Sequence, residues 1–212
     1  MIQAVIFDMD GTILNTLDDL KESVNITLSN FGFKTRTLEE VRQFVGNGVK
    51  LLFQRALPDG IDDETLEKCI CFFKKTYAQN MYNHTAPYKG ILKILQEIKS
   101  LGLKTAVVSN KFDLAVKELS KKYFDDLIDI SVGQSDDVPQ KPAPNGVIKA
   151  MKELNIQTAI YVGDSDVDVQ TAKNANLPCV GVTWGFRDRE YLKGADYIID
   201  SPEELMQIIR SI

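Results

Sequence analysis

The segment that most constrains the fold of this chain is residues 3–12, which read Gln-Ala-Val-Ile-Phe-Asp-Met-Asp-Gly-Thr. Its apolar, β-branched run predicts a buried strand of a parallel sheet. Residues two apart on a strand point to the same side, so Asp8 and Asp10 are expected to project together from its carboxyl end, where open α/β sheets bind ligands. Two adjacent carboxylates repel each other unless a cation or a shared proton intervenes. A hard divalent metal would explain the pair, and an ordinary strand followed by an Asp-Gly turn is the competing interpretation.

Composition and charge narrow the class of protein. With 212 residues, 44% hydrophobic and 26% charged, the chain is typical of a globular protein of one or two domains. A net charge of −5 with scattered basic residues argues against a nucleic-acid or anionic-membrane partner. Three cysteines, no cationic leader and no apolar run of membrane-spanning length favour a cytoplasmic protein. Either a monomer or a homodimer is compatible with this sequence.

A block of helices is predicted directly after the first strand. Apolar residues recur at helical spacing over residues 17–31, and Thr37 to Glu40 has the form of a capping box that opens a second helix. Further helices are expected on both sides of a turn at residues 58–60. We therefore predict a helical cap over residues 16–84, inserted into a core formed by residues 1–15 and 85–212.

The remainder of the chain alternates between strands and helices. Strands are expected at residues 105–108, 127–132, 159–162, 178–182 and 197–199. Such alternation predicts a parallel sheet with right-handed crossovers. The predicted fold class is α/β, a doubly wound (Rossmann-like) parallel sheet core with an inserted α-helical cap domain.

Polar side chains gather where the predicted strands end. They are Asp8 and Asp10, Ser109 and Asn110, Lys141, and Asp164 and Asp168. Each has an ordinary explanation on its own, as a helix cap, a solvated loop lysine or an acid in the first turn of a helix. Their convergence on one rim of one sheet favours a functional site.

The order of these motifs resembles that of the haloacid-dehalogenase-superfamily phosphatases. The motifs on which this resemblance rests are Asp8-x-Asp10-Gly11-Thr12, Ser109-Asn110, Lys141-Pro142 and Gly163-Asp164-Ser165-x-x-Asp168. Segments 46–48, 85–90 and 181–185 are similar to the phosphoglycolate-phosphatase-like branch, which carries a helical cap after the first motif. Asn15 departs from the pattern, since many relatives have Asp there.

The resemblance implies a Mg²⁺-dependent phosphatase that acts on a small phosphorylated metabolite, with phosphoglycolate favoured, through an aspartyl-phosphate. Asp8 would be the nucleophile and Asp10 the general acid and base. Asp8, Asp164 and the backbone carbonyl of Asp10 would hold Mg²⁺, and Asp168 would fix a water bound to it. The groups expected to hold the phosphoryl oxygens are Lys141, Ser109 and the backbone around Gly11, Thr12 and Asn110.

Substrate contacts outside the phosphate site are expected from the cap and from one core loop. The candidates are Gly46, Asn47, Gly48, Lys50 and Arg187. An ordinary turn between two helices explains the glycines equally well. His84, the only histidine, is expected to be structural or exposed.

Several other functions compete with this prediction. Pyrophosphate, a sugar phosphate or a nucleotide could replace phosphoglycolate as the substrate. A β-phosphoglucomutase-like transferase is disfavoured because residues 17–20 lack the expected histidine, and a dehalogenase would need no acid at position 10. A signalling receiver is too short, and a non-catalytic phosphate-binding protein would not need Asp10, Lys141 and Asp164 together.

Overall fold

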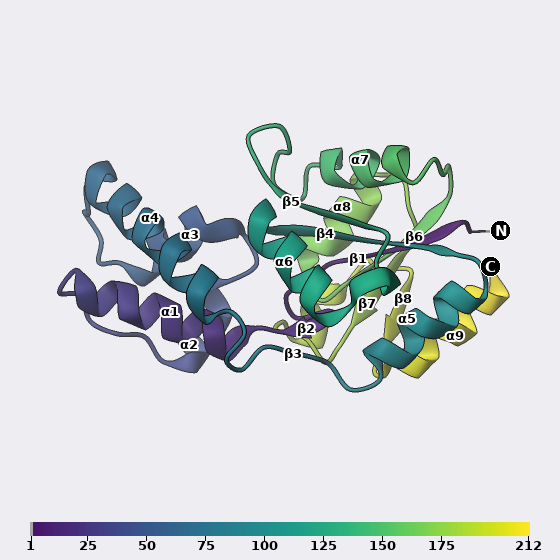
Figure 1. Cartoon of the computed structure of the whole chain (residues 1–212), viewed down its shortest axis with the longest axis horizontal. Helices are drawn as coiled ribbons and strands as arrows, with labels where there is room; N and C mark the ends of the chain where they lie inside the picture. The colour runs from purple at the N-terminus through teal and green to yellow at the C-terminus, as the bar shows by residue number, and fades with distance from the viewer. Residues whose placement is uncertain (1) are drawn as a thin grey trace.

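The computed structural model describes residues 2–212 and contains a six-stranded parallel sheet with the strand order β5-β4-β1-β6-β7-β8 (Figure 1). The strands are β1 (Ala4–Phe7), β4 (Lys104–Phe112), β5 (Ile130–Gln134), β6 (Ala159–Gly163), β7 (Cys179–Val182) and β8 (Tyr197–Ile199). The first strand lies in the interior of the sheet, paired in parallel with β4 on one side and β6 on the other. This confirms the predicted doubly wound sheet.

Helices cover both faces of the sheet. They are α5 (Ile91–Ser100), α6 (Asp113–Tyr123), α7 (Asn145–Glu153), α8 (Asp166–Asn174) and α9 (Pro202–Ser211). Val5 and Phe7 of β1 pack in one hydrophobic cluster with apolar residues of α5, α6 and α9. Ala4 and Ile6 pack in a second cluster with residues of α7 and α8. All four strand residues are buried because β1 is covered on both faces, which explains its uninterrupted apolar run.

Two strands differ from the sequence prediction at their ends. Strand β4 continues to Phe112, beyond the predicted end at residues 108–110, because pairing with β5 resumes between Phe112 and Gln134 after a register shift. Strand β5 begins at Ile130, later than predicted, because Asp125–Leu127 forms a 3₁₀ turn. The longer β4 places Lys111 on a strand rather than in a loop.

Four helices form a separate group beside the sheet, on the left of Figure 1, and we refer to them as the helical group. They are α1 (Leu17–Asn30), α2 (Leu38–Phe44), α3 (Gly48–Ala56) and α4 (Asp63–Asn80). The capping box predicted at Thr37 and Glu40 is confirmed at the start of α2. Aromatic rings join α3 to α4, with the Phe53 and Phe73 ring centres 5.2 Å apart.

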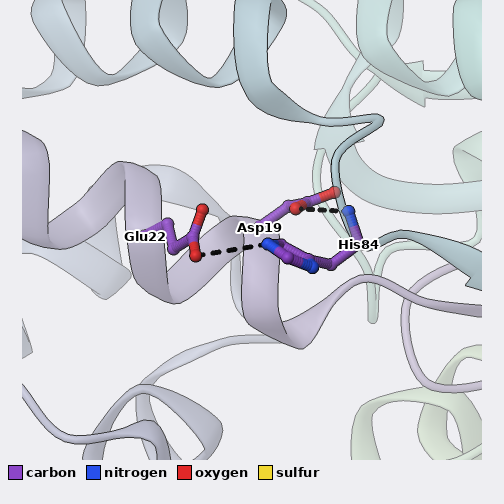
Figure 2. Close-up of side chains that lie close together, drawn as sticks. All are labelled: Asp19, Glu22 and His84. Carbon is purple, nitrogen blue, oxygen red and sulfur yellow. Dashed lines mark hydrogen bonds and ion pairs between the residues drawn. The ribbon is translucent and has the colours of Figure 1, made fainter.

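A short antiparallel ribbon connects the helical group to the sheet. Strand β2 (Leu14–Asn15) leads out and β3 (Ala86–Pro87) returns, with Asn15 paired with Ala86. Beside this ribbon, the fully buried Asp19 carboxylate accepts hydrogen bonds from the backbone N–H groups of His84 and Thr85, each at 2.9 Å. Figure 2 shows the hydrogen bond from His84 N–H to Asp19 and the contact between His84 Nε2 and Glu22, which measures 3.3 Å. The His84 side chain is half-exposed, as the sequence predicted.

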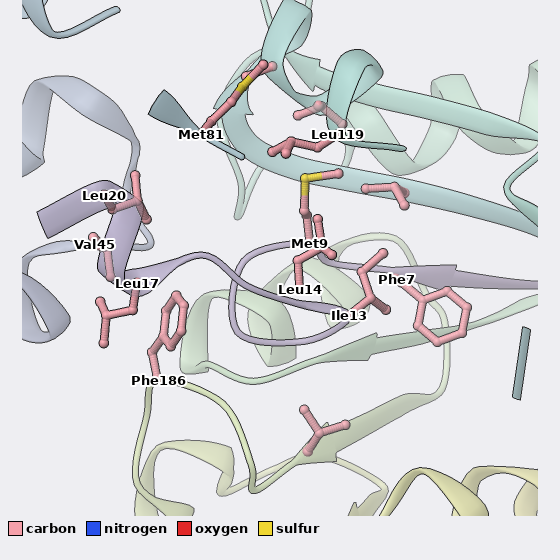
Figure 3. Packing of buried hydrophobic residues seen from close by; sticks show 14 of the residues in the cluster. Phe7, Met9, Ile13, Leu14, Leu17, Leu20, Val45, Met81, Leu119 and Phe186 are labelled. Atoms are coloured by element: carbon pink, nitrogen blue, oxygen red, sulfur yellow. The ribbon is translucent and has the colours of Figure 1, made fainter. Parts of the chain in front are cut away.

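The apolar core continues from the sheet into the helical group. Figure 3 shows Phe7 and Met9 of the first strand segment in the same cluster as Leu17 and Leu20 of α1 and Phe186 of a loop after β7. Burial of this shared surface holds the helical group against the carboxyl ends of the strands. Within residues 2–212, none of the helices has both the length and the apolar character needed to cross a membrane.

Candidate active site

A cavity of about 60 Å³ lies between the carboxyl ends of the strands and the helical group. Nine residues that the sequence singled out line it: Asp8, Asp10, Gly46, Gly48, Ser109, Asn110, Lys141, Asp164 and Arg187. They come from the segment directly after β1, from β4, from the loops after β5, β6 and β7, and from the junction of α2 with the start of α3. The predicted convergence at one rim of the sheet is therefore present in the structure.

Lys141 is the centre of a buried group of charges. Its Nζ lies 2.8 Å from Asp8 Oδ1 and 2.7 Å from Asp168 Oδ1. The same ammonium donates a hydrogen bond of 3.1 Å to the hydroxyl of Tyr161, which rises from the middle of β6. Because an ammonium between two carboxylates offsets much of the cost of burying all three charges, Lys141 can remain protonated under the cavity.

Asn110 fixes the backbone of Lys141. Its Oδ1 accepts from Lys141 N at 2.7 Å, and its Nδ2 donates to Lys141 O at 3.2 Å. The same Nδ2 donates to the carbonyl of Gly46 in the helical group at 3.1 Å. Asn110 thus joins the strand end, the lysine loop and the segment between α2 and α3.

Asp164 is held against two glycines. Its Oδ2 accepts from the backbone N–H of Phe186 at 2.7 Å. A Cβ on Gly11, whose φ is +87°, or on Gly185 would overlap the Asp164 side chain. Both positions require glycine so that the backbone can approach this carboxylate closely.

Burial raises the pKa of two of the carboxylates. For Asp8, desolvation raises the pKa to about 7 although the Lys141 charge opposes it. For Asp164, burial and the charges of Asp168 and Asp8 raise the pKa well above its usual range. Ionised forms of both groups therefore need a further positive charge nearby.

The carboxylates fit a divalent cation that prefers oxygen ligands. Asp8, Asp164 and Asp168 each offer an oxygen, and these oxygens lie within 4.8 Å of one another. Asp168 already uses both oxygens, since Oδ1 accepts from Lys141 and Tyr161 while Oδ2 accepts from the backbone and hydroxyl of Ser165. Asp8 and Asp164 are therefore the carboxylates with the greatest capacity to bind an ion directly.

Asp10 points to a different part of the cavity. Its Oδ1 accepts from the Thr16 hydroxyl at 2.7 Å, and Lys111 Nζ lies 2.9 and 3.1 Å from its two oxygens. The side chain thus faces the helical group, separate from the carboxylates around Lys141. Sequence reasoning missed Lys111. The one signal in the sequence was its position directly after Ser109 and Asn110. Its contact with Asp10 depends on β4 continuing to Phe112 past a register shift.

The predicted phosphate-binding turn lies beside the cavity. Gly11 supports Asp164, as described above, and Thr12 is buried with a hydroxyl that has no hydrogen-bond partner among the described residues. Ser109 lines the cavity, and its hydroxyl accepts from the backbone N–H of Lys111 at 3.3 Å. Neither Gly11 nor Thr12 lines the cavity itself.

The other predicted substrate contacts occupy several environments. Gly46 and Gly48 face the cavity, whereas Asn47 accepts a hydrogen bond from Arg55 and Lys50 is exposed on α3 outside the cavity lining. Arg187 lines the cavity, but its guanidinium donates to backbone carbonyls at the end of α2. These are Arg42 O and Val45 O, both at 2.6 Å, and Gln43 O at 3.4 Å.

The family model for haloacid dehalogenase-like hydrolases matches residues 5–182, and the chain belongs to this family. The phosphoglycolate phosphatase of Aquifex aeolicus (strain VF5) is 31% identical over 215 residues, covering 98% of this chain and 97% of that protein. A crystal structure of a predicted phosphoglycolate phosphatase from Haemophilus somnus 129PT has a TM-score of 0.90 at 25% identity, covering 98% of both chains. A predicted phosphatase from Clostridium acetobutylicum has a TM-score of 0.89 at 30% identity, covering 100% of both chains. Within the family, the chain is a phosphatase similar to the phosphoglycolate phosphatases.

Proposed function

We propose that the protein hydrolyses a small phosphomonoester, with phosphoglycolate as the favoured substrate, through a phosphoryl group carried on Asp8. The observation that carries the proposal is the buried Asp8 carboxylate, 2.8 Å from Lys141 and in one cavity with Asp164. The name of the Aquifex aeolicus relative supports the choice of substrate.

In the first step, an Asp8 oxygen forms a bond to phosphorus and the ester P–O bond breaks, with its electron pair leaving on the substrate oxygen. Lys141 and the Ser109 hydroxyl hold the phosphoryl oxygens as charge develops on them. Asp168 and Tyr161 keep the Lys141 ammonium at its place through their contacts of 2.7 and 3.1 Å. The donors are thus oriented before the substrate arrives.

Asp10 transfers the proton in both steps. In the proposed sequence it gives a proton to the leaving oxygen and then takes one from the water that attacks the phosphorylated Asp8. Its position on the side of the helical group suits this role, because the organic part of the substrate must lie between the phosphate site and those helices. Phosphate and the free Asp8 carboxylate are the products of the second step.

Asp8, Asp164 and the backbone carbonyl of Asp10 are proposed to hold Mg²⁺. When bound, this ion supplies positive charge that offsets the repulsion between the Asp8 carboxylate and a phosphate dianion. The raised pKa values of Asp8 and Asp164 and their clustered oxygens support this assignment.

The helical group, with residues 16–84 as its proposed limits, would act as a cap that excludes water and contacts the organic part of the substrate. Its contribution of Gly46, Gly48 and several apolar side chains to the cavity supports this role. The two glycines bring backbone close to the site without filling it.

The test is phosphate release from phosphoglycolate, pyrophosphate, a sugar phosphate and a nucleotide, each with and without Mg²⁺. We expect phosphoglycolate to have the highest kcat/KM and Asp8→Asn to lose at least about 10³-fold in kcat. Asp136→Asn, a change of the same kind at an exposed loop acid, serves as the matched control. Full turnover by Asp8→Asn would overturn the mechanism, and a flat substrate profile would overturn the substrate while leaving the mechanism standing.

A further inference from the structure

Lys111 is a buried cation that the phosphate site leaves unused. Its side chain is 4% exposed, and it lines the cavity from the end of β4. Burying an ammonium is unfavourable unless charged or polar partners surround it, so the presence of Lys111 at the cavity wall needs an explanation. Its partners are the carboxylate of Asp10 and the ring of Tyr77, whose centre is 4.4 Å from Nζ.

These partners leave part of the ammonium available. A lysine ammonium has three N–H donors, and among the described residues the Lys111 ammonium makes two hydrogen bonds, both to Asp10. Asp10 in turn has a second donor, the Thr16 hydroxyl, and does not depend on Lys111 alone. Tyr77, which also lines the cavity, is fully buried and its hydroxyl has no hydrogen-bond partner among the residues described.

The other cations that line the cavity are committed elsewhere. Lys141 is bound between Asp8 and Asp168 in the proposed phosphate site. The Arg187 guanidinium is occupied by the backbone carbonyls at the end of α2. Of the lining residues with a positive charge, Lys111 alone can take a second anionic group.

The helical group gives this part of the cavity an apolar wall. Its lining side chains are Leu20, Val45, Val49, Leu52, Phe73 and Tyr77. Sugar hydroxyls packed against these apolar side chains would lose their hydrogen bonds to water without gaining new ones, which is unfavourable. The apolar wall and the buried cation together fit a short substrate chain that carries one negative charge.

We propose that the Lys111 ammonium is the subsite for a carboxylate of the substrate, so that the enzyme selects phosphate esters of small hydroxy acids over neutral esters of the same size. The inference rests on the proposed phosphatase function and specifies its substrate class. Lys111 would then contact both the Asp10 carboxylate and the substrate carboxylate, with the Tyr77 ring holding the ammonium between them.

The test compares two substrates of nearly the same shape, 2-phosphoglycolate and its neutral carboxamide, 2-phosphoglycolamide. We expect the wild-type protein to prefer the carboxylate by about 10- to 100-fold in kcat/KM, the usual worth of a hydrogen bond to a charged group. In Lys111→Met this ratio should fall to within about threefold of unity, whereas Lys111→Arg should retain most of it. The ratio is informative because any disturbance of Asp10 affects both esters alike.

Lys121→Met, the same change at an exposed lysine of α6, is the matched control and should retain the wild-type ratio. Thermal melts of each variant establish that it is folded. Equal hydrolysis of both esters by the wild-type protein, or an unchanged ratio in Lys111→Met, would overturn the carboxylate subsite. Hydrolysis of neither ester above the level of Asp8→Asn would instead overturn the proposed phosphatase function.

Discussion

At the scale of single residues, each charged group of the site is held by contacts with several neighbouring side chains. Lys141 contacts Asp8 and Asp168, and the Asn110 side chain fixes the Lys141 backbone at both its N–H and its carbonyl. A ligand that hydrogen-bonds to Lys141 therefore contacts a donor whose position Asp8, Asp168 and Asn110 already hold fixed. This preorganisation reduces the cost of rearrangement during the reaction.

The raised pKa of Asp8 predicts how Mg²⁺ will stabilise the protein at different pH values. Burial raises this pKa from 3.8 to about 7, so without metal the folded state binds more protons than the unfolded state. The stability that Asp8 contributes is present at low pH and is lost as the pH rises through about 7. Because Mg²⁺ is proposed to bind the ionised carboxylate, its effect on stability should be small at about pH 5.5 and large at about pH 8.

Thermal melts with and without about 10 mM MgCl₂ measure this difference. We expect Mg²⁺ to raise Tm by about 3–6 °C at about pH 8 and by less than about 1 °C at about pH 5.5. In Asp8→Asn the carboxamide does not titrate, and the difference between the two pH values should shrink. An equal rise in Tm on adding Mg²⁺ at both pH values in the wild-type protein would contradict the proposed binding of Mg²⁺ to Asp8.

At the scale of elements, the ribbon of β2 and β3 depends on one buried acid. Both oxygens of Asp19 accept hydrogen bonds from the returning chain, including one of 2.8 Å from the Thr85 hydroxyl. Asp19→Ala leaves two backbone N–H groups and a hydroxyl without this acceptor. We expect the free energy of unfolding to fall by about 2–4 kcal/mol, measured by urea denaturation.

Asp18→Ala is the matched control for this prediction. Asp18 lies in the same first turn of α1 and shares its favourable position near the helix amino terminus, but its side chain is exposed. We expect this change to cost no more than about 0.5 kcal/mol. Similar losses in the two variants would show that helix electrostatics, rather than the anchor to residues 84 and 85, governs the effect.

The sequence was most informative where a pattern repeats within one element. The uninterrupted apolar run of β1, the apolar spacing of α1 and the capping box of α2 each predicted the element that forms. The same local rules predicted that acids and Lys141 would gather at one rim, because the carboxyl ends of parallel strands share an edge. These features depend on neighbours only a few residues away.

Features that depend on the paths of distant segments were not predictable. The ion pair of Lys111 with Asp10 joins residues 101 positions apart, and it requires β4 to continue beyond its register shift. Arg187 stays a predicted substrate contact that lines the cavity, and the contact of its guanidinium with carbonyls at the end of α2 is set by tertiary packing. Neither contact has a signature within its own segment.

At the scale of the whole molecule, the helical group and the sheet are joined a second time by a reciprocal pair of arginines. Arg187 donates to carbonyls of Arg42 and Val45, while Arg42 donates to the carbonyl of Phe186 at 2.5 Å. Arg187→Met removes the larger part of this connection. We expect the amides of α2 and α3 to exchange with deuterium about tenfold faster, while those of β1 and β6 keep their protection.

Arg189→Met is the control for the loss of an arginine from the same segment. Arg189 is more than half exposed and pairs with Asp200, so its contact does not reach the helical group. We expect its exchange pattern to match that of the wild-type protein. Unchanged protection of α2 and α3 in Arg187→Met would show that the apolar core alone keeps the cavity covered.

The pairing of Asn15 with Ala86 has a consequence for how such a protein can diversify. Residues 16–85 form an insertion whose two ends lie next to each other. Replacing them with another insert would therefore leave the order of the sheet strands and the pairing between them unchanged. Under the proposed mechanism, the groups that handle phosphate would remain in place through such an exchange. Replacing the insert could then change which organic group the protein prefers, while the reaction at phosphorus stays the same.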